Sequence, residues 1–553
     1  MPTQSASSNA ELSSCNRLQT PVDLKSPSAA ASSIFICVLL LLAALGVSPA
    51  RAQGYKDLYD FAGSMAPSYP AVIFEGRNNN LYGVTATGGT SGNGTIFRIG
   101  PSGSFSVLYN FDGTHGSKPV GGLALGPDGD LYGMAEDGGA NSYGNIFKIS
   151  MAGAFSVLYD FKGTTDGGYP VSPLTLGSDG NFYGTSYPGY AFKVTPAGAF
   201  TLLSTIPGTS NGALVQASNG AFYGVTEYGG THSAGAIYKL FGTTVTLIHS
   251  FDGPHGSYPF AGLALGADGN LYGTTTAGGT SNAGVIYRIT PTGTYKVLVH
   301  FDNVNTLNGY QSFAGLISGA DGNLYGATIW GGQFGNGVIF SISTDGAYSV
   351  LYNFDAPTGV GAYITPMQHT NGRIYGMTTR GGGAGKGVIY SFDEGLEPFV
   401  QLVTTSGPVG RSIGILGKGF SQATGVEFNG TAASFHVLSD TYMTTTVPSG
   451  ETGFVTVETA SGHLTSSRLF RVSPSLTGFS PTSGAVGTTL TLTGSGLIQM
   501  INITVGGVPV SVYTVNSDSQ VTTRVPTGAK TGKIVVTTPG GTATRNDVFT
   551  VTQ

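Results

Sequence analysis

The side chains of this 553-residue chain that could recognise a ligand or take part in catalysis are scattered over its glycine-rich loops. Aromatic rings beside carboxylates suit sugar binding, because a ring face stacks on a sugar and a carboxylate accepts protons from hydroxyl groups. The alternative is that Trp330 and Phe334 cover the loops or pack between repeats. The candidate binding residues are Glu136, Asp137, Tyr143, Glu227, Tyr228, His232, Trp330, Phe334 and Arg380.

Glycoside hydrolysis would need a pair of carboxylates about 5 to 10 Å apart. Glu136, Asp137 and Glu227 are the most suitable acids, but the first two are adjacent and the third lies in another repeat. We therefore predict no catalytic residues. A secreted carbohydrate-active enzyme, either a glycoside hydrolase or a lyase, is the first alternative. A purely structural surface protein, whose loop residues are solvated decoration, is the second.

Metal, cofactor and nucleic-acid sites are not indicated by the sequence. The eight histidines are scattered singly, and each repeated Asp-Gly pair (Asp128, Asp179, Asp268, Asp321) is alone in a short turn, whereas a calcium loop needs several oxygens. No Gly-x-Ser-x-Gly elbow or phosphate-binding loop occurs in the required context. The net charge is −5 with no basic run, which disfavours nucleic acid. We expect no metal, no cofactor and a monomer.

The elements that must position these residues come from a repeat. A motif of an apolar residue followed by Tyr-Gly recurs seven times, with intervals of 50, 51, 40, 49, 53 and 50 residues between its tyrosines. A fixed period of this size indicates a repeat architecture. The seven motif tyrosines are Tyr82, Tyr132, Tyr183, Tyr223, Tyr272, Tyr325 and Tyr375.

Each period predicts four short antiparallel strands. In the second period the strands are 120–125, 131–135, 145–150 and 154–161, with an Asp-Gly turn after the first and a glycine-rich loop after the second. Four strands per period of about 50 residues are typical of a propeller blade. We predict a seven-bladed β-propeller over residues 53–397. Residues 55–61 resemble a fourth strand and the seventh period has only three, so the N-terminal strand is predicted to complete the last blade.

The long loops are predicted to open on one face, where binding residues would concentrate. The 40-residue interval reflects a shortened third blade, which lacks the Gly-Gly loop (residues 185–190), and a trimmed connection at 206–211. A notch beside Glu227 and Tyr228 is therefore the predicted ligand entry. Five tyrosines before the first strands are assigned to one repeat position, and their recurrence favours packing between blades. They are Tyr69, Tyr169, Tyr258, Tyr310 and Tyr363.

The C-terminal part contains two copies of a different unit, offset by 77 residues from Gly407 to Gly484. Short Val- and Thr-rich strands between Gly and Pro turns predict immunoglobulin-like sandwiches, at 398–472 and 473–553. The chain has 89 Gly and only 10% charged residues, a composition that suits many short strands and tight turns.

The N-terminus resembles an export signal. Residues 34–47 are an apolar run of 14, shorter than the about 20 residues needed to span a bilayer. Ala50-Arg51-Ala52 fits a cleavage site, so residues 1–52 are predicted to be a signal peptide and leader, cleaved near Ala52. The mature chain would be secreted and extracellular, with no membrane span. Both cysteines, Cys15 and Cys37, precede the cut, which leaves no disulfide.

The repeat resembles the GloVer tandem repeat of the choice-of-anchor family, through its Asp-Gly-Asn-Leu-Tyr-Gly core, the following Gly-Gly loop and the Gly-Val-Ile-Tyr strand, as in residues 268–287. The C-terminal units resemble IPT/TIG domains, through Thr-Ser-Gly-x-Val-Gly and a later Gly-x-Gly-Phe or Gly-x-Gly-Leu. The resemblance implies a secreted or surface bacterial protein, but no established activity.

Members of that family often end in an anchoring signal, whereas residues 547–553 have neither an apolar tail nor a basic cluster. Free secretion, or attachment through another protein, follows as a hypothesis. The function predicted from the sequence is non-catalytic recognition or adhesion. The loop face would bind a polysaccharide or a cell-surface protein, and the TIG domains would act as spacers or docking modules.

Overall fold

The computed structural model describes residues 54–63, 65–67 and 73–553, so the predicted signal peptide lies outside the described residues. Within these ranges the chain is strands, turns and loops, and its helical elements are two single turns, η1 (Thr306–Asn308) and η2 (Phe420–Gln422). No helix in the described ranges is long and apolar enough to cross a membrane. The prediction of an all-β chain is confirmed.

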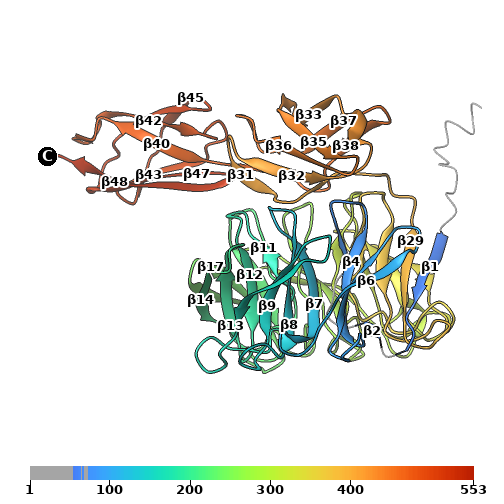
Figure 1. Ribbon diagram of the computed structural model, residues 1–553. Helices are drawn as coiled ribbons and strands as arrows, with labels where there is room; N and C mark the ends of the chain where they lie inside the picture. Colours follow the sequence, from blue (N-terminus) through green and yellow to red (C-terminus); the bar gives the residue numbers. More distant parts are fainter. Residues whose placement is uncertain (1–53, 64, 68–72) are drawn as a thin grey trace, which may run out of the picture. The chain divides into compact units, whose positions relative to one another are not determined.

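Residues 54–393 form seven antiparallel sheets, one for each predicted period (Figure 1). The first strands of sheets 1 to 7 are β3 (Phe74–Glu75), β7 (Ser117–Leu125), β11 (Thr175–Leu176), β15 (Val215–Gln216), β19 (Ala264–Leu265), β23 (Ile317–Ser318) and β27 (Met367–Gln368). The second strands are β4 (Leu81–Thr87), β8 (Leu131–Asp137), β12 (Phe182–Ser186), β16 (Phe222–Thr226), β20 (Leu271–Thr274), β24 (Leu324–Ala327) and β28 (Ile374–Met377).

The third strands are β5 (Thr95–Ile99), β9 (Asn145–Ile149), β13 (Tyr190–Val194), β17 (Ala236–Phe241), β21 (Val285–Ile289), β25 (Val338–Ile342) and β29 (Val388–Asp393). The fourth strands of sheets 1 to 6 are β6 (Phe105–Asn110), β10 (Phe155–Asp160), β14 (Phe200–Thr205), β18 (Thr244–Ser250), β22 (Tyr295–His300) and β26 (Tyr348–Asn353). A short strand, β2 (Ala66–Pro67), also pairs with β4.

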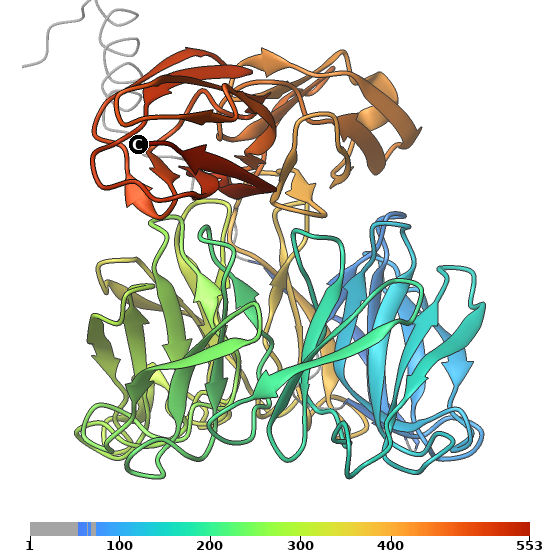
Figure 2. The same cartoon turned by 90° about the vertical axis from the view of Figure 1, so that its left-hand side faces the viewer.

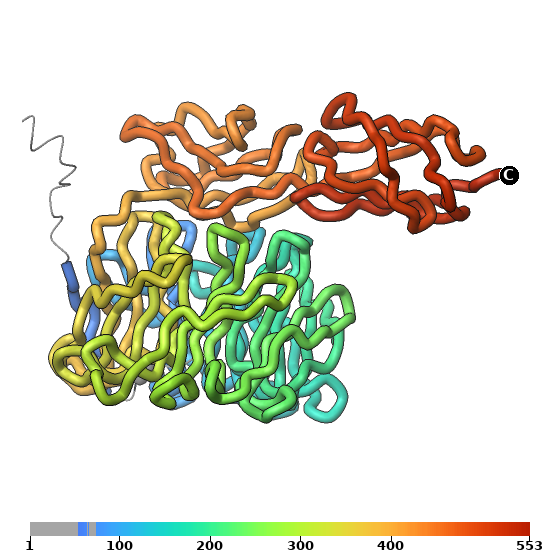
Figure 3. The backbone as a smooth tube through the Cα atoms, turned by 180° about the vertical axis from the view of Figure 1, so that it is seen from behind, coloured from blue at the N-terminus to red at the C-terminus, as the bar shows by residue number. Residues whose placement is uncertain are grey.

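The fourth strand of sheet 7 comes from the other end of the repeat region. β1 (Gly54–Asp60) pairs antiparallel with β29, as the sequence predicted, and the blue strand lies beside the gold one in Figures 1 and 3. In this pairing Tyr55 lies opposite Phe392 and Asp60 lies opposite Val388. Sheet 7 therefore reaches four strands only with residues that are more than 300 positions away in the sequence.

Each motif glycine makes room for an aromatic ring on the adjacent third strand. A Cβ atom built on Gly83 would lie 2.4 Å from Phe97 Cζ, and one on Gly273 would lie 2.3 Å from Tyr287 Oη. The nearest neighbour of the added atom is in both cases a side chain rather than backbone. Such glycines are needed because the large rings of the third strand are completely buried.

We expect Gly273→Ala to lower the free energy of unfolding by about 1–3 kcal/mol, because the added methyl overpacks a closed interior. The control is Gly425→Ala, since a Cβ there would meet only the end of the flexible Glu458 side chain, at 3.2 Å. Denaturant unfolding of both variants measures the difference. Equal stabilities for the two variants would contradict the packing role of the motif glycine.

The motif tyrosines are fixed by the turn that precedes them. The Tyr132 hydroxyl donates to Asp128 Oδ2 at 2.7 Å, and the Tyr82 hydroxyl accepts from Asn78 Nδ2 at 2.9 Å. Burial, together with the Asp128 carboxylate, raises the pKa of Tyr132, so the phenol stays protonated and can donate. All seven motif tyrosines bond an Asp or Asn four residues earlier.

Consecutive sheets pack through groups of three aromatic rings, and in Figure 2 they follow one another side by side in chain order. The first ring of each group is the Phe that follows the fourth strand of one sheet. It contacts two rings of the next sheet, one on the third strand and one at the start of the fourth strand, and the ring centroids are about 5–6 Å apart. The six groups are Phe61/Phe97/Phe105, Phe111/Phe147/Phe155, Phe161/Phe192/Phe200, Phe251/Tyr287/Tyr295, Phe301/Phe340/Tyr348 and Phe354/Tyr390/Tyr55. Between sheets 3 and 4 the place is taken by Ile206, Tyr238 and Val245.

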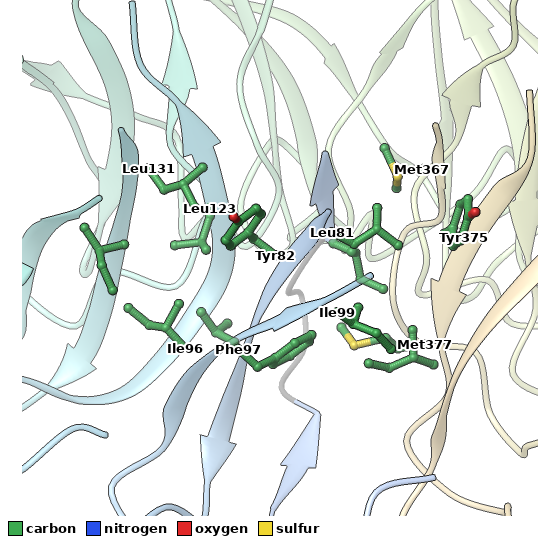
Figure 4. Close-up of a cluster of buried hydrophobic side chains, with 14 of the residues drawn as sticks. Leu81, Tyr82, Ile96, Phe97, Ile99, Leu123, Leu131, Met367, Tyr375 and Met377 are labelled. Atoms are coloured by element: carbon green, nitrogen blue, oxygen red, sulfur yellow. The ribbon is translucent and has the colours of Figure 1, made fainter. Parts of the chain in front are cut away.

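Sheet 7 packs against sheet 1 in the same way as the other neighbours. Tyr59 of β1 stacks on Phe105 of β6 with centroids 3.9 Å apart, as Tyr109 stacks on Phe155 between sheets 1 and 2. One buried cluster contains Leu81 and Phe97 of sheet 1, Leu123 of sheet 2 and Tyr375 of sheet 7 (Figure 4). The first and last sheets therefore share a core.

Residues beyond 398 form two sandwiches, each with a separate core. In the first, β30 (Gln401–Leu402), β32 (Ser412–Leu416), β36 (Tyr442–Thr446) and β35 (Phe435–Ser439) face β34 (Thr431–Ala432), β33 (Gly425–Phe428), β37 (Val455–Thr459) and β38 (Gly462–Thr465), and β31 (Ser406–Pro408) pairs with β39 (Arg471–Ser473). In the second, β40 (Ser475–Ser480), β42 (Thr489–Ser495), β46 (Gln520–Arg524) and β45 (Tyr513–Ser517) face β41 (Ser483–Gly484), β48 (Gly541–Val551), β47 (Gly532–Thr538), β43 (Asn502–Val505) and β44 (Val508–Pro509).

Candidate functional site

The two ends of the seven sheets differ in their connections. One end, here called the turn face, carries the tight turns between first and second strands, such as residues 126–130 and 177–181. The other end, the loop face, carries the loops between second and third strands and the connections between sheets. All nine sequence-predicted binding residues belong to strand ends or loops of the loop face.

The loops of the loop face are held by the same backbone bonds in most sheets. Gly144 N–H donates to Gly138 O at 3.0 Å, and Gly284 N–H donates to Gly278 O at 3.0 Å. A second bond crosses between sheets, because Tyr169 N–H donates to Tyr143 O at 2.8 Å and Tyr258 N–H donates to Ala234 O at 2.8 Å. The loop face is therefore a fixed scaffold rather than a set of independent loops.

The structure places the two predicted groups of carboxylates in separate surroundings. Asp137 Oδ2 forms an ion pair with Lys118 Nζ at 2.6 Å, and burial raises the pKa of the half-buried Glu136. Glu227 Oε2 accepts a hydrogen bond from Asn211 Nδ2 at 2.7 Å. Among the described residues, no ion pair or hydrogen bond joins Glu227 to Glu136 or Asp137. Glu227 and the adjacent Glu136 and Asp137 therefore have different polar partners.

Two pairs of tyrosine rings lie on the loop face. Tyr143 contacts Tyr169 with centroids 5.6 Å apart, and Tyr228 contacts Tyr258 at the same distance. Glu227 beside Tyr228 raises the pKa of that phenol. The candidates Tyr143, Glu227 and Tyr228 are therefore each part of a cluster of polar and aromatic groups.

The other candidates do not join these clusters. His232 is exposed and its Nδ1 lies 3.0 Å from Thr231 Oγ1. Trp330 is half-buried and its backbone pairs antiparallel with that of Tyr310, whereas Phe334 is exposed in the same loop of sheet 6. Arg380 is exposed in sheet 7, where its backbone pairs with Val360. The nine predicted residues are thus spread over sheets 2, 4, 6 and 7.

The sequence assigned five tyrosines to one repeat position, of which Tyr69 lies outside the described residues; the assignment holds for Tyr169 and Tyr258 and is wrong for Tyr310 and Tyr363. Tyr169 and Tyr258 are equivalent, with φ of 48° and 56°, but the equivalent residue before sheet 6 is Gln311, with φ of 53°. The backbone of Tyr310 instead pairs with that of Trp330. Before sheet 7 the position equivalent to Tyr169 is held by Gly361, and Tyr363 lies two residues beyond it. Tyr169 and Tyr258 are also partly exposed, at 38% each.

Sequence reasoning missed Tyr169 and Tyr187 as site residues. Tyr187 lies in the short turn that replaces the Gly-Gly loop of sheet 3, and its ring is exposed. The available signal was the shortened third period, whose short replacement loop contains Tyr187.

Metal binding has no support from the described side chains, since no three His, Cys, Asp or Glu residues among them gather at one point. The turn carboxylates that suggested calcium are engaged by tyrosines: Asp128, Asp268 and Asp321 each accept from a motif phenol at 2.7–2.8 Å. The repeated Asp-Gly pairs are thus explained by turn geometry and the tyrosine bond.

The turn face contacts the first sandwich. Arg411 donates to the Ser178 carbonyl, Thr441 Oγ1 donates to Arg77 O at 2.6 Å, and Phe399 N–H donates to Thr370 O at 3.1 Å. A cavity of about 290 Å³ between Met367, Phe399 and Arg468 lies at this junction. These contacts all involve turn-face or first-strand residues, so they do not obstruct the loop face.

A larger cavity, of about 630 Å³, lies on the second sandwich between Val486 and Thr527. Its lining is mostly Val, Thr and Pro, with Tyr513 and Arg524 as the ionisable members, and contains no carboxylate or imidazole. Such a lining offers little for catalysis or for recognition of hydroxyl groups. The loop face is the better candidate site.

Comparison with known proteins relates both parts of the chain to families. The Gloeobacter/Verrucomicrobia repeat model matches residues 47–191 and 186–390, and the IPT/TIG domain model matches residues 398–468 and 474–551. Among curated protein sequences, none matches the chain.

Solved structures give only distant similarities. A fungal alcohol oxidase of the AA5 family, in complex with copper, has 13% identity and a TM-score of 0.45, over 76% of this chain and 99% of the other. The WD40 β-propeller domain of Doa1 has 14% identity and a TM-score of 0.42, over 62% and 98%. The surface glycan-binding protein PbSGBP-B from Prevotella bryantii has 22% identity and a TM-score of 0.21, over 26% and 38%.

Proposed function

Because the chain belongs to the Gloeobacter/Verrucomicrobia repeat family and ends in two IPT/TIG domains, we propose that it is a non-catalytic recognition protein of the bacterial exterior. The seven sheets are the blades of a seven-bladed propeller spanning residues 53–397. The loop face of that propeller binds a polysaccharide or a cell-surface protein, and the domains at 398–472 and 473–553 act as spacers or docking modules.

The way in which the last sheet is completed and packed supports the propeller proposal. β1 gives sheet 7 its fourth strand, and the aromatic groups between sheets 6 and 7 and between sheets 7 and 1 repeat the pattern of the other seams. A series of seven similar sheets whose last member packs on the first removes the exposed edges of an open array.

The observation that carries the recognition role is the composition of the loop face. Exposed tyrosine rings lie beside Glu227 and Asn211 on loops that are fixed by backbone hydrogen bonds. Stacking rings with adjacent hydrogen-bonding groups suit a ligand rich in both hydroxyl groups and apolar faces, such as a sugar chain.

A polysaccharide-binding screen tests the proposal. The chain from residue 53 onward is expected to be retained by at least one polysaccharide in affinity electrophoresis, with no release of reducing ends. If reducing ends appear and are lost in Glu136→Ala or Glu227→Ala, the protein is an enzyme. If neither binding nor release is found with polysaccharides or cell-surface preparations, the protein is structural.

A further inference from the structure

The exposed tyrosines of the described chain are confined to one region. Most tyrosines are buried or half-buried, and the four that are more exposed are Tyr169 at 38%, Tyr187 at 58%, Tyr228 at 54% and Tyr258 at 38%. All four lie on the loop face of sheets 2 to 5. With the half-buried Tyr143 they are here called the tyrosine row.

Ring and backbone contacts connect neighbouring members of the row. The ring of Tyr143 meets Tyr169, and the adjacent Gly168 exchanges two backbone hydrogen bonds with Tyr187, at 3.0 and 2.8 Å. The ring of Tyr228 meets that of Tyr258. The row therefore has two halves, one on sheets 2 and 3 and one on sheets 4 and 5.

Two close glycine contacts join these halves. A Cβ on Gly189 would lie 2.6 Å from Gly208 O, and one on Gly208 would lie 2.1 Å from Tyr228 O. Neither glycine could carry a side chain without separating the backbones. The shortened loop of sheet 3 and the trimmed connection after it are what bring Tyr187 and Tyr228 onto neighbouring segments.

The backbone does not require tyrosine at two of these positions. Tyr169 and Tyr258 have left-handed φ values of 48° and 56°, and the equivalent positions before sheets 2 and 6 are held by Lys118 and Gln311, with φ of 49° and 53°. The equivalent position before sheet 7 is Gly361, with φ of 68°, which forms the same type of inter-sheet hydrogen bond to Asn336 O at 3.2 Å. Since lysine, glutamine and glycine hold the equivalent positions, the fold does not require a tyrosine ring at either one.

Polar groups accompany the rings on both sides. Glu227 and Asn211 lie beside Tyr228, and Asp137 with Lys118 lies in sheet 2 near the other end. Carboxylate and amide groups accept and donate the hydrogen bonds that sugar hydroxyls need. The acids Glu136, Asp137, Asp166 and Glu227 exceed the nearby bases Lys118 and Lys162, which disfavours an acidic chain.

We propose that the tyrosine row binds one extended segment of a neutral polysaccharide, whose sugar rings stack on successive tyrosines from sheet 2 to sheet 5. This inference rests on the proposed recognition function and names its site and ligand class. A proline-rich peptide is the competing ligand for a row of aromatic rings. The polar groups between the rings favour the sugar chain, because a peptide of that type offers few hydroxyl groups.

The test measures the binding of the chain from residue 53 onward to hydroxyethylcellulose, xylan, galactomannan and dextran, with alginate and polygalacturonate as acidic probes and a polyproline peptide. The row predicts binding to at least one neutral polymer. Tyr187→Ala and Tyr228→Ala should each weaken it about tenfold or more, the loss typical of a truncated anchoring aromatic. Tyr228→Phe, which keeps the ring, should stay within about threefold of the parent.

Phe241, at 58% exposed, ends β17 at the turn face of sheet 4 and provides the matched control, because Phe241→Ala should not change binding more than about twofold. Phe334, at 54% exposed, lies on the loop face of sheet 6, and Phe334→Ala tests the alternative that the ligand binds there. Unchanged melting temperatures of all variants establish that binding alone is affected.

The outcomes separate the two proposals. If a neutral polysaccharide binds and Phe334→Ala weakens it while the tyrosine variants do not, the row is refuted and recognition by the loop face stands. Preference for the acidic polymers or for polyproline also refutes the row. If no probe polysaccharide binds, both the row and the proposed polysaccharide recognition fail.

Discussion

A chain that lacks residues 53–62 is expected to unfold at a much lower denaturant concentration than the parent, or to aggregate. The deletion removes β1, the whole fourth strand of sheet 7, together with Tyr59 and the completely buried Phe61. It also breaks the stack of Tyr55 on Tyr352, whose ring centroids lie 4.2 Å apart. Because truncating one buried Phe to Ala already costs about 3–5 kcal/mol, the total loss should exceed about 5 kcal/mol.

The same deletion exposes β29 as an open edge, which favours association with other chains. Denaturant unfolding and light scattering of the shortened chain measure both effects. Lys56→Ala, at an exposed position of β1, is the control and should leave stability unchanged within about 0.5 kcal/mol. Adding a synthetic peptide of residues 53–62 should restore part of the stability. An unchanged midpoint in the deletion variant would contradict closure by β1.

Glu75→Gln is expected to stabilise the protein at pH 8 by up to about 3 kcal/mol. Glu75 is 1% exposed at the seam of sheets 7 and 1, where its carboxylate accepts from Thr370 N–H at 2.8 Å and Thr370 Oγ1 at 2.6 Å. Two other seams use glutamine for this contact: Gln216 Oε1 accepts from Ser178 N–H and Gln368 Oε1 from Ala320 N–H, both at 2.8 Å. The seam between sheets 7 and 1 therefore forms the same type of hydrogen bond, but with an ionisable carboxylate as the acceptor.

The pH dependence follows from the pKa values on the two sides of unfolding. Burial, opposed by the Thr370 bonds, raises the pKa of Glu75 from 4.5 to about 7. The stability that Glu75 contributes is thus full below pH 4.5 and is lost as the pH rises through 7. A difference of about 2.5 pKa units corresponds to about 3 kcal/mol.

His369 acts in the opposite direction at the same seam. Its Nε2 lies 3.5 Å from Glu75 Oε1, and burial lowers its pKa from 6.5 to about 4. The stability that His369 contributes is full above pH 6.5 and is lost as the pH falls through 4. Between about pH 4.5 and 6.5 the parent therefore loses stability through Glu75 and gains stability through His369 as the pH rises, and the two changes offset each other. In Glu75→Gln only the gain through His369 remains.

The expected result is that Glu75→Gln and the parent are equally stable near pH 4.5 and that the variant gains steadily up to pH 8, in urea unfolding at each pH. Gln216→Glu, at the seam of sheets 3 and 4, is the matched reverse change and should lose stability at pH 8 but not at pH 4.5. A constant difference between the parent and Glu75→Gln at all pH values would show that ionisation at residue 75 does not govern the seam.

The parts of the fold that depend on local sequence were predictable. Residues 131–135 and 145–150 alternate or repeat as strands do, and the Asp-Gly turn before Tyr132 fixes the hairpin that joins two of them. The bond between Asp128 and Tyr132 was missed, although a recurring Asp or Asn four residues before each motif tyrosine was a visible signal. The pairing of residues 55–61 with the last sheet was predicted because the seventh period has only three strands and residues 55–61 resemble a fourth.

The seams and the site depend on contacts that the sequence does not specify. Glu75 and Thr370 are separated by 295 residues, and nothing near either one indicates that they meet. Tyr310 is a case in which the count from the next motif tyrosine was informative: Tyr258 and Gln311 each lie 14 residues before it, whereas Tyr310 lies 15 before it, and the left-handed position is held by Gln311. Tyr187 is held beside Gly168 by two backbone hydrogen bonds that join the shortened loop of sheet 3 to the preceding connection.

Amide hydrogen exchange of the chain from residue 53 onward, with and without a bound polysaccharide, tests the proposed role of the loop face most directly. The account predicts that exchange slows at residues 186–190 and 227–235, by about tenfold or more at saturation, while the turns at 126–130 and 266–270 are unchanged. Slower exchange confined to the turn face or to residues 398–551 would contradict it.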